Sequence, residues 1–217
     1  MMSRMRSKAQ LLVLLISGAS AQIALDSGNG SRSPDENPRY FPVGVFAEGK
    51  SDDDFVARWY ACQLRALREP TLWENTSANV ELTYRFTWLR TFDHPIAIRI
   101  VVHPNGAGTL KAKVADGTGG YKPGSLVVNT TREIGVKEVR HLQDLVRALD
   151  FWHMPPEPAP NDKVVGVDGA QWIFEASNKG NYHVIDRWSP RNGPVRELGL
   201  YVVRKLGKLD VPEKAIY

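Results

Sequence analysis

The sequence predicts a single α+β domain in which an antiparallel sheet of about six strands has its helices packed on one face. Three observations lead to this prediction: runs of alternating apolar and polar residues, short turn segments between these runs, and helical apolar spacing in three other segments. Strands joined by short turns form antiparallel meanders, and a sheet with one apolar face buries that face against helices. The chain of 217 residues is long enough for one such domain.

The first 21 residues predict a secretory signal peptide. Basic residues at 4–8 precede an apolar run at 11–16, and Ala19-Ser20-Ala21 fits a small-residue cleavage site. We therefore expect a secreted or periplasmic protein that meets the membrane only transiently, through its leader. An uncleaved anchor is the alternative, but the apolar run is short for a bilayer span.

A polar segment over residues 22–39 predicts a flexible linker, so the folded domain is expected over 40–217. The chain has a formal net charge of +4, but three of its 28 basic residues and none of its 24 acidic residues lie in the leader. The remainder carries a net charge of about +1, which does not predict nucleic-acid binding.

Cys62 is the single cysteine and cannot close an internal disulfide. Its place in an amphipathic segment predicts a buried, inert thiol. Three asparagines begin glycosylation sequons, which matter only in a eukaryotic secretory route. They are Asn29, Asn75 and Asn129.

The first predicted helix begins at residues 51–54, where Ser51 can cap it, and ends at Pro70. Apolar spacing predicts a second helix over 136–150, followed by a proline-rich connector. A final helix is expected from Pro194 to Gly207. Alternation predicts four strands between the first two helices. They span about 80–92, 96–102, 110–114 and 125–132.

Residues 169–190 are predicted to form two strands joined by a tight turn at Asn178-Lys179-Gly180. Apolar and polar residues alternate on both sides of this spacer, and Gly180 accepts the positive φ that a short hairpin loop needs. With the turn centred on the spacer, we expect Glu175 and His183 to lie on one surface of the sheet.

The same segment resembles an uncharacterised family of exported bacterial proteins. The resemblance extends from about Tyr40 to the C-terminus, and it implies a bacterial envelope setting. Because the family has no established activity, it assigns no catalytic residue. The residues that carry it are Gly169-Ala170-Gln171-Trp172, Glu175, Tyr182-His183 and Asp186-Arg187-Trp188-Ser189-Pro190, followed by a Leu-Gly-rich helix.

Charged residues on the predicted open face of the sheet are the candidates for ligand binding. Arginines can hold an anionic ligand or an envelope protein, and a carboxylate beside a histidine can perform acid–base chemistry. The alternative is a set of solvated cross-strand ion pairs without function. The ligand-binding candidates are Arg85, Arg99, Asp186, Arg187 and Trp188, and the catalytic candidates are Glu175 and His183.

The local motifs of metal sites, phosphate-binding loops and activated nucleophiles do not occur, so the sequence predicts no metal site and no cofactor. Trp88 and Trp172 fall on apolar strand faces and are expected in the core, whereas Trp188 is expected to be partly exposed. We therefore favour a non-enzymatic exported binding module. The alternatives are a cell-envelope hydrolase or transferase using Glu175 and His183, and a structural envelope protein.

Overall fold

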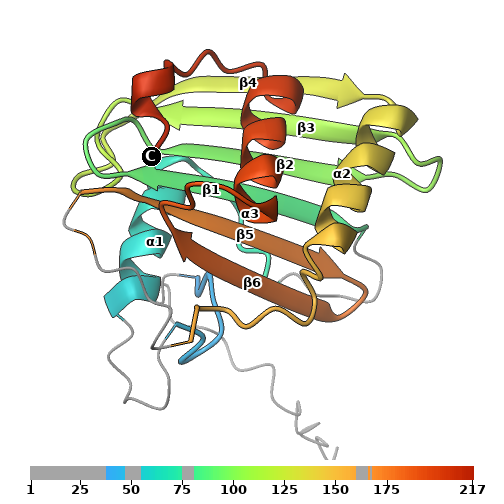
Figure 1. The fold of residues 1–217 in the computed structure, drawn as a ribbon, viewed down its shortest axis with the longest axis horizontal. Coiled ribbons are helices and arrows are strands. Elements are labelled where there is room, and N and C mark those ends of the chain that lie inside the picture. Colours follow the sequence, from blue (N-terminus) through green and yellow to red (C-terminus); the bar gives the residue numbers. More distant parts are fainter. Residues whose placement is uncertain (1–37, 47–54, 75–80, 160–165, 167) are drawn as a thin grey trace, which may run out of the picture. The chain divides into compact units, whose positions relative to one another are not determined.

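The computed structural model describes residues 38–46, 55–74, 81–159, 166 and 168–217 (Figure 1). They belong to one compact unit, Pro38–Tyr217. The signal peptide expected over 1–21 and nearly all of the expected linker lie outside the described residues. Within the described ranges, no helix has the length and apolar character required to cross a bilayer.

Six strands form one antiparallel sheet, which confirms the predicted fold class. The element order also agrees with the prediction: a helix, four strands, a helix, two strands and a helix. In space the order is β4-β3-β2-β1-β5-β6, so the meander and the later hairpin meet where β1 pairs with β5. The strands are β1 Thr83–Arg90, β2 Ile96–Val102, β3 Gly108–Ala115, β4 Leu126–Ile134, β5 Ala170–Asn178 and β6 Asn181–Trp188.

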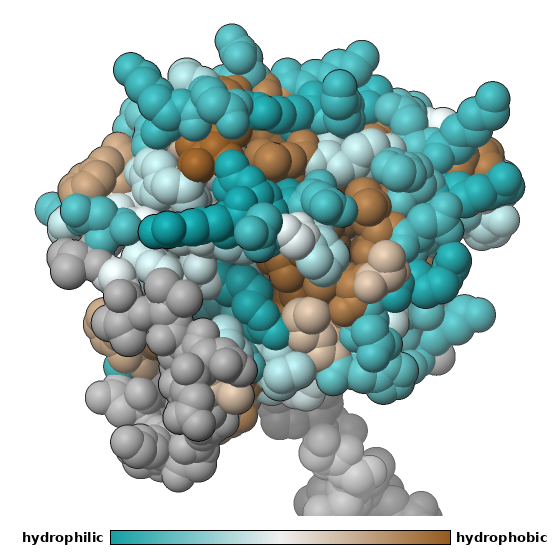
Figure 2. All heavy atoms as spheres, in the orientation of Figure 1, coloured by the Kyte–Doolittle hydropathy of each residue, from teal (hydrophilic) through white to brown (hydrophobic). Residues whose placement is uncertain are grey.

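Helices α2 (Val136–Ala148) and α3 (Pro194–Leu200) cover one face of this sheet, and α3 continues into the π-helix η2 (Tyr201–Leu206). The core beneath them is aromatic and aliphatic, and Trp88 and Trp172 are fully buried in it, as predicted. Figure 2 shows this side of the molecule: hydrophilic residues dominate, with hydrophobic patches between and beside the helices.

Helix α1 (Phe55–Ala66) lies on the opposite face, behind the sheet in Figure 1. In this respect the structure differs from the prediction that all helices pack on one face. Tyr60 and Leu64 of α1 belong to a second buried core on that side. On this face the strands carry apolar residues as well as charged ones, and α1 packs against the apolar residues. These apolar residues are Leu89, Ala97, Ala115, Ile173 and Val184.

Cys62 is exposed, which contradicts the prediction of a buried thiol. The buried face of α1 is formed instead by the residues on either side of it. They are Tyr60, Ala61, Gln63 and Leu64.

The predicted hairpin is present, but its loop contains only two residues. Lys179 has φ 44° and Gly180 has φ 88°, and Asn178 pairs directly with Asn181. Positive φ at both central positions is the pattern of a type I′ turn, whose twist matches that of the flanking strands. The loop length fixes the register of the two strands and therefore the face on which each side chain lies.

The final helix packs closely on the sheet because Gly199 lies against the indole of Trp172. A Cβ atom at Gly199 would stand 2.4 Å from Cζ3 of that ring. Since real Cβ atoms do not approach other atoms so closely, a side chain at this position would force the helix away from the core.

We predict that Gly199→Ala destabilises the protein by about 1–3 kcal/mol, because the overlap outweighs the better helix propensity of alanine, roughly 1 kcal/mol. Gly135→Ala is the matched control, since its new Cβ would lie 3.8 Å from the nearest atom, an ordinary contact. Urea denaturation measures both variants. Equal midpoints for the two would contradict the close packing.

Candidate functional site

Charged side chains gather at the centre of the sheet face that carries α1. Lys111 of β3 lies directly opposite Arg99 of β2. Arg99 in turn lies opposite Arg85 of β1, and Arg85 lies opposite Glu175 of β5. Directly opposed residues point to the same face, with Cβ atoms about 4.5–5.5 Å apart. We call Arg85, Arg99 and Lys111 the basic row.

Arg85 and Glu175 form a fully buried, bidentate ion pair. Arg85 Nε donates to Glu175 Oε2 at 2.6 Å, and Nη2 donates to Oε1 at 2.7 Å. The Tyr182 hydroxyl donates to Oε1 at 2.8 Å, and Arg85 Nη1 donates to the Pro70 carbonyl at 2.6 Å. Burial by itself lowers the pKa of Arg85, but the carboxylates of Glu175 and Glu69 raise the pKa above its ordinary value. The guanidinium therefore stays charged.

Glu69, just after α1, supplies a second buried carboxylate. Its Oε2 accepts a hydrogen bond from Arg99 Nε at 2.8 Å and lies 3.7 Å from Arg85 Nη1, while its Oε1 lies 2.8 Å from Lys113 Nζ. Burial raises the pKa of Glu69, but the attraction of Arg85, Arg99 and Lys113 outweighs it and lowers the pKa below its ordinary value. We call Glu69, Arg85, Arg99, Lys113 and Glu175 the ionic cluster.

The ionic cluster corrects the prediction of an open, solvated face. Arg85, Glu69 and Glu175 have fully buried side chains, and 14% of the Arg99 side chain is exposed. The segment after α1 covers them: Arg85 Nη1 bonds to the Pro70 carbonyl, as noted above, and the Tyr40 hydroxyl donates to the Glu69 carbonyl at 2.7 Å. Alternation identifies which residues share a face, but it does not reveal which distant segment covers them.

Glu175 and His183 lie on opposite faces of the sheet, so the predicted acid–base pair is wrong. Glu175 pairs with Val184, whereas His183 pairs with Ala176. A three-residue loop would have placed Glu175 opposite His183, but the two-residue loop shifts the register by one position and reverses the face. On the α2 side, the His183 ring contacts Phe151 with ring centroids 5.0 Å apart.

His183 Nε2 lies 2.9 Å from the Met154 carbonyl, so this nitrogen donates the hydrogen bond and is protonated. Burial lowers the pKa of His183, assisted by the charge of Arg187. Both interactions tie β6 to the connector after α2, and the neutral imidazole has a structural role there.

The other predicted ligand-binding residues at the end of β6 also have internal partners. Asp186 accepts a hydrogen bond from the buried Tyr60 hydroxyl at 2.6 Å. Arg187 lies on the face opposite the ionic cluster and donates to the carbonyl oxygens of Pro155 and Pro156 at 2.8 and 2.9 Å. Trp188 is half-buried, as expected, and its indole lies close to Gly169.

Lys111 is the charged residue whose importance the sequence analysis missed. It is half-buried, and it forms no ion pair with any residue in the described part of the chain. The alternation of β3 already placed Lys111 and Lys113 on one face, but the register that brings Lys111 opposite Arg99 follows from the Pro104-Asn105-Gly106 turn. Like charges in direct opposition destabilise a sheet unless an anion compensates them.

Across the described ranges, no group of three or more His, Cys, Asp or Glu residues is placed to hold a metal ion. No protein-family model matches the chain, and no curated protein is significantly similar to it. The candidate site is therefore argued from its own geometry. It consists of the buried ionic cluster and, beside it, Lys111, the less buried end of the basic row.

We predict that Glu69→Gln lowers the free energy of unfolding by about 3–5 kcal/mol at about pH 7, because it leaves three cations facing one carboxylate fewer. The folded-state pKa of Glu69 lies below the unfolded value, near 4.5, so its contribution is present above that pH and is lost as the pH falls through the folded pKa. The difference between wild type and variant should therefore narrow at about pH 3.

Guanidinium denaturation at both pH values measures this difference. Glu213→Gln is the matched control, because Glu213 pairs with Arg204 at the surface and its side chain is 77% exposed. A difference that stays constant down to about pH 3 would refute the assigned charge state of Glu69.

Proposed function

We propose that this chain is an exported, non-enzymatic binding protein whose basic row holds an anionic group of a ligand or an envelope protein. The observation that carries the proposal is the direct opposition of three basic residues on three neighbouring strands. Export is supported by the leader pattern of residues 1–21.

Among the residues that the structure describes, the charges around the basic row do not balance. Arg85, Arg99, Lys111 and Lys113 supply four cations, while Glu69 and Glu175 supply two carboxylates. The carboxylates engage the buried end of the row, so the excess positive charge lies towards Lys111. An anion beside Lys111 and Arg99 would relieve the repulsion between them, and Arg99 can add a planar hydrogen-bonding fork.

Within the described chain, the neighbours of Lys111 on β4 provide no carboxylate that pairs with it. Thr131 of β4 lies opposite Lys111 and is exposed. The nearest acidic residue along that strand, Glu133, accepts a hydrogen bond from the Thr109 hydroxyl at 2.9 Å and lies 3.9 Å from His103 Nε2. Thr109 and His103 engage the Glu133 carboxylate two residues further along β4 than Thr131, so Glu133 does not neutralise Lys111.

The enzyme alternative loses its proposed acid–base pair, because Glu175 and His183 lie on opposite faces. Glu175 is also fully buried and accepts hydrogen bonds from Arg85 and Tyr182. A purely structural role is the competing explanation for the basic row, and the two roles predict opposite effects of removing Lys111.

We predict that Lys111→Gln weakens the binding of inorganic phosphate or sulfate about tenfold, since it removes one charged contact worth roughly 1.4 kcal/mol. In the absence of these anions the variant should be as stable as the wild type, or more stable by about 0.2–1 kcal/mol, because the cross-strand repulsion is gone. Thermal unfolding at constant ionic strength, with chloride as the reference anion, measures both effects.

Lys137→Gln is the matched control, because Lys137 is an exposed lysine on α2, on the other side of the sheet. It should leave the phosphate dependence unchanged. A loss of stability in anion-free Lys111→Gln would indicate a structural role instead. The absence of any saturable anion effect on the wild type would overturn the proposed site.

We also predict that the full chain is processed after Ala21 when it is produced in a bacterial host, so that the periplasmic or secreted product begins at Gln22. Fractionation followed by intact mass spectrometry measures this. Ala21→Asp should block cleavage and leave the precursor with the membrane. Recovery of the intact wild-type precursor from the cytosol would contradict export.

A further inference from the structure

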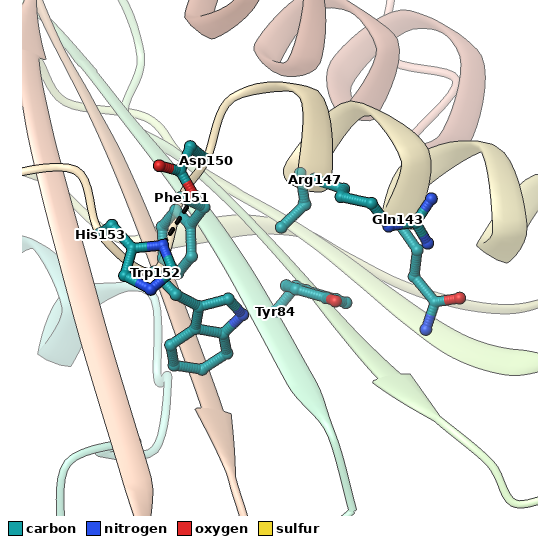
Figure 3. Close-up of a pocket in the computed structure, with 8 residues that line it drawn as sticks. Tyr84, Gln143, Arg147, Asp150, Phe151, Trp152 and His153 are labelled. Atoms are coloured by element: carbon teal, nitrogen blue, oxygen red, sulfur yellow. Dashed lines mark hydrogen bonds and ion pairs between the residues drawn. The ribbon is translucent and has the colours of Figure 1, made fainter.

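A hollow of about 400 Å³ lies on the face of the sheet opposite the basic row (Figure 3). Its volume falls within the range of small-molecule sites, about 300–1,000 Å³. Tyr84 reaches it from β1, Gln143 and Arg147 extend from α2, and the turn after α2 contributes Trp152 and His153. The hollow therefore combines residues from a strand, a helix and a turn.

The turn after α2 has a defined backbone. Asp150 adopts a left-handed conformation with φ 52°, which aspartate tolerates better than most residues. The amide groups of His153 and Met154 both donate to the Asp150 carbonyl, at 3.0 and 3.1 Å. This arrangement holds Trp152 beside the hollow, where its side chain packs against Phe151 with ring centroids 5.4 Å apart.

Trp152 lines the hollow, and 38% of its surface is exposed. An exposed indole of this kind offers a flat apolar surface and an N–H donor in one residue. Nearby, burial raises the pKa of Tyr84 to about 12, so its hydroxyl is neutral and can both donate and accept. Within the described chain, neither this hydroxyl nor the Gln143 amide has a hydrogen-bond partner.

The charged groups at the rim neutralise one another. Arg147 Nη1 lies 2.8 Å from Asp144 Oδ1, and His153 Nδ1 lies 2.7 Å from Asp150 Oδ1. The hydrogen bond that His153 donates to the Asp150 carboxylate raises the pKa of His153, which favours its charged form. Because Arg147 and His153 each have a carboxylate partner, an anion or a cation in the hollow gains little net attraction. The balance favours a neutral ligand, in contrast to the basic row.

An entirely apolar ligand would also fit poorly. It would bury the Tyr84 hydroxyl and the Gln143 amide without partners, at a cost of about 1–3 kcal/mol each. A ligand that satisfies all three conditions is neutral, has a face of C–H groups for the indole, and carries hydroxyls that donate as well as accept. We infer that this hollow is a binding site for a saccharide, with Trp152 stacking on a sugar ring and Tyr84 and Gln143 bonding to its hydroxyls.

Two-dimensional NMR of the full chain, labelled with ¹⁵N, tests this inference through the indole N–H of Trp152. The probes are the disaccharides cellobiose, maltose, lactose and chitobiose, titrated separately. At least one of them should saturably shift the Trp152 indole resonance and the backbone amide of His153, which also lines the hollow and remains as a reporter in Trp152→Ala. Trp152→Ala should weaken that saccharide at least tenfold, because it removes the stacking surface.

Trp73→Ala is the matched control, since Trp73 is also 37% exposed but packs against Tyr182 on the other face. It should leave saccharide binding unchanged, while Gln143→Leu should weaken binding and preserve the fold. The inference is overturned if none of the four sugars shifts the Trp152 indole resonance, or if the His153 backbone amide shifts with unchanged affinity in Trp152→Ala. Because Lys111 lies on the opposite face, the result is independent of anion binding.

Discussion

The buried ion pair between Arg85 and Glu175 is the constraint on which the rest of this structure depends. It joins β1 to β5, the one place where the four-strand meander and the hairpin meet. A charge this deep is stable only if it is paired and hydrogen-bonded, and Arg85 is held by hydrogen bonds to Glu175 and the Pro70 carbonyl and by the nearby Glu69 carboxylate. The same pair therefore links the meander to the hairpin and, through the Pro70 carbonyl, holds the chain after α1 against the sheet.

The pairing within the ionic cluster also determines which basic residue of the described sheet keeps an uncompensated positive charge. Glu69 is shared by three cations, which is enough to lower its own pKa but not to neutralise all of its neighbours. A sheet designed only for stability would replace Lys111, which repels Arg99 across the strand boundary, by a neutral residue. The proposed anion site would account for this position of Lys111, which forms no ion pair with any residue in the described part of the chain.

The strands and helices were predictable from the sequence because period-two and helical spacing are local properties. Their bounds differ from the predictions by a few residues, as for β1 and β4. The coverage of each face was not predictable in this way. Whether Glu175 is solvated depends on α1, more than a hundred residues earlier, and its relation to His183 depends on one residue of loop length. If Lys179-Gly180 is taken as a two-residue loop, Glu175 pairs with Val184. The sequence then places Glu175 and His183 on opposite faces of the sheet.

Tyr84 and Arg85 are consecutive residues of β1, so they point to opposite faces of the sheet. One forms the floor of the hollow beside α2, and the other is the centre of the ionic cluster. Because Arg85 is bonded on all sides, the backbone of β1 at this point has little freedom to shift. The ionic cluster therefore fixes the position of Tyr84 from the opposite face of the sheet. The two proposed sites, one for an anionic group and one for a neutral ligand, consequently share a rigid strand.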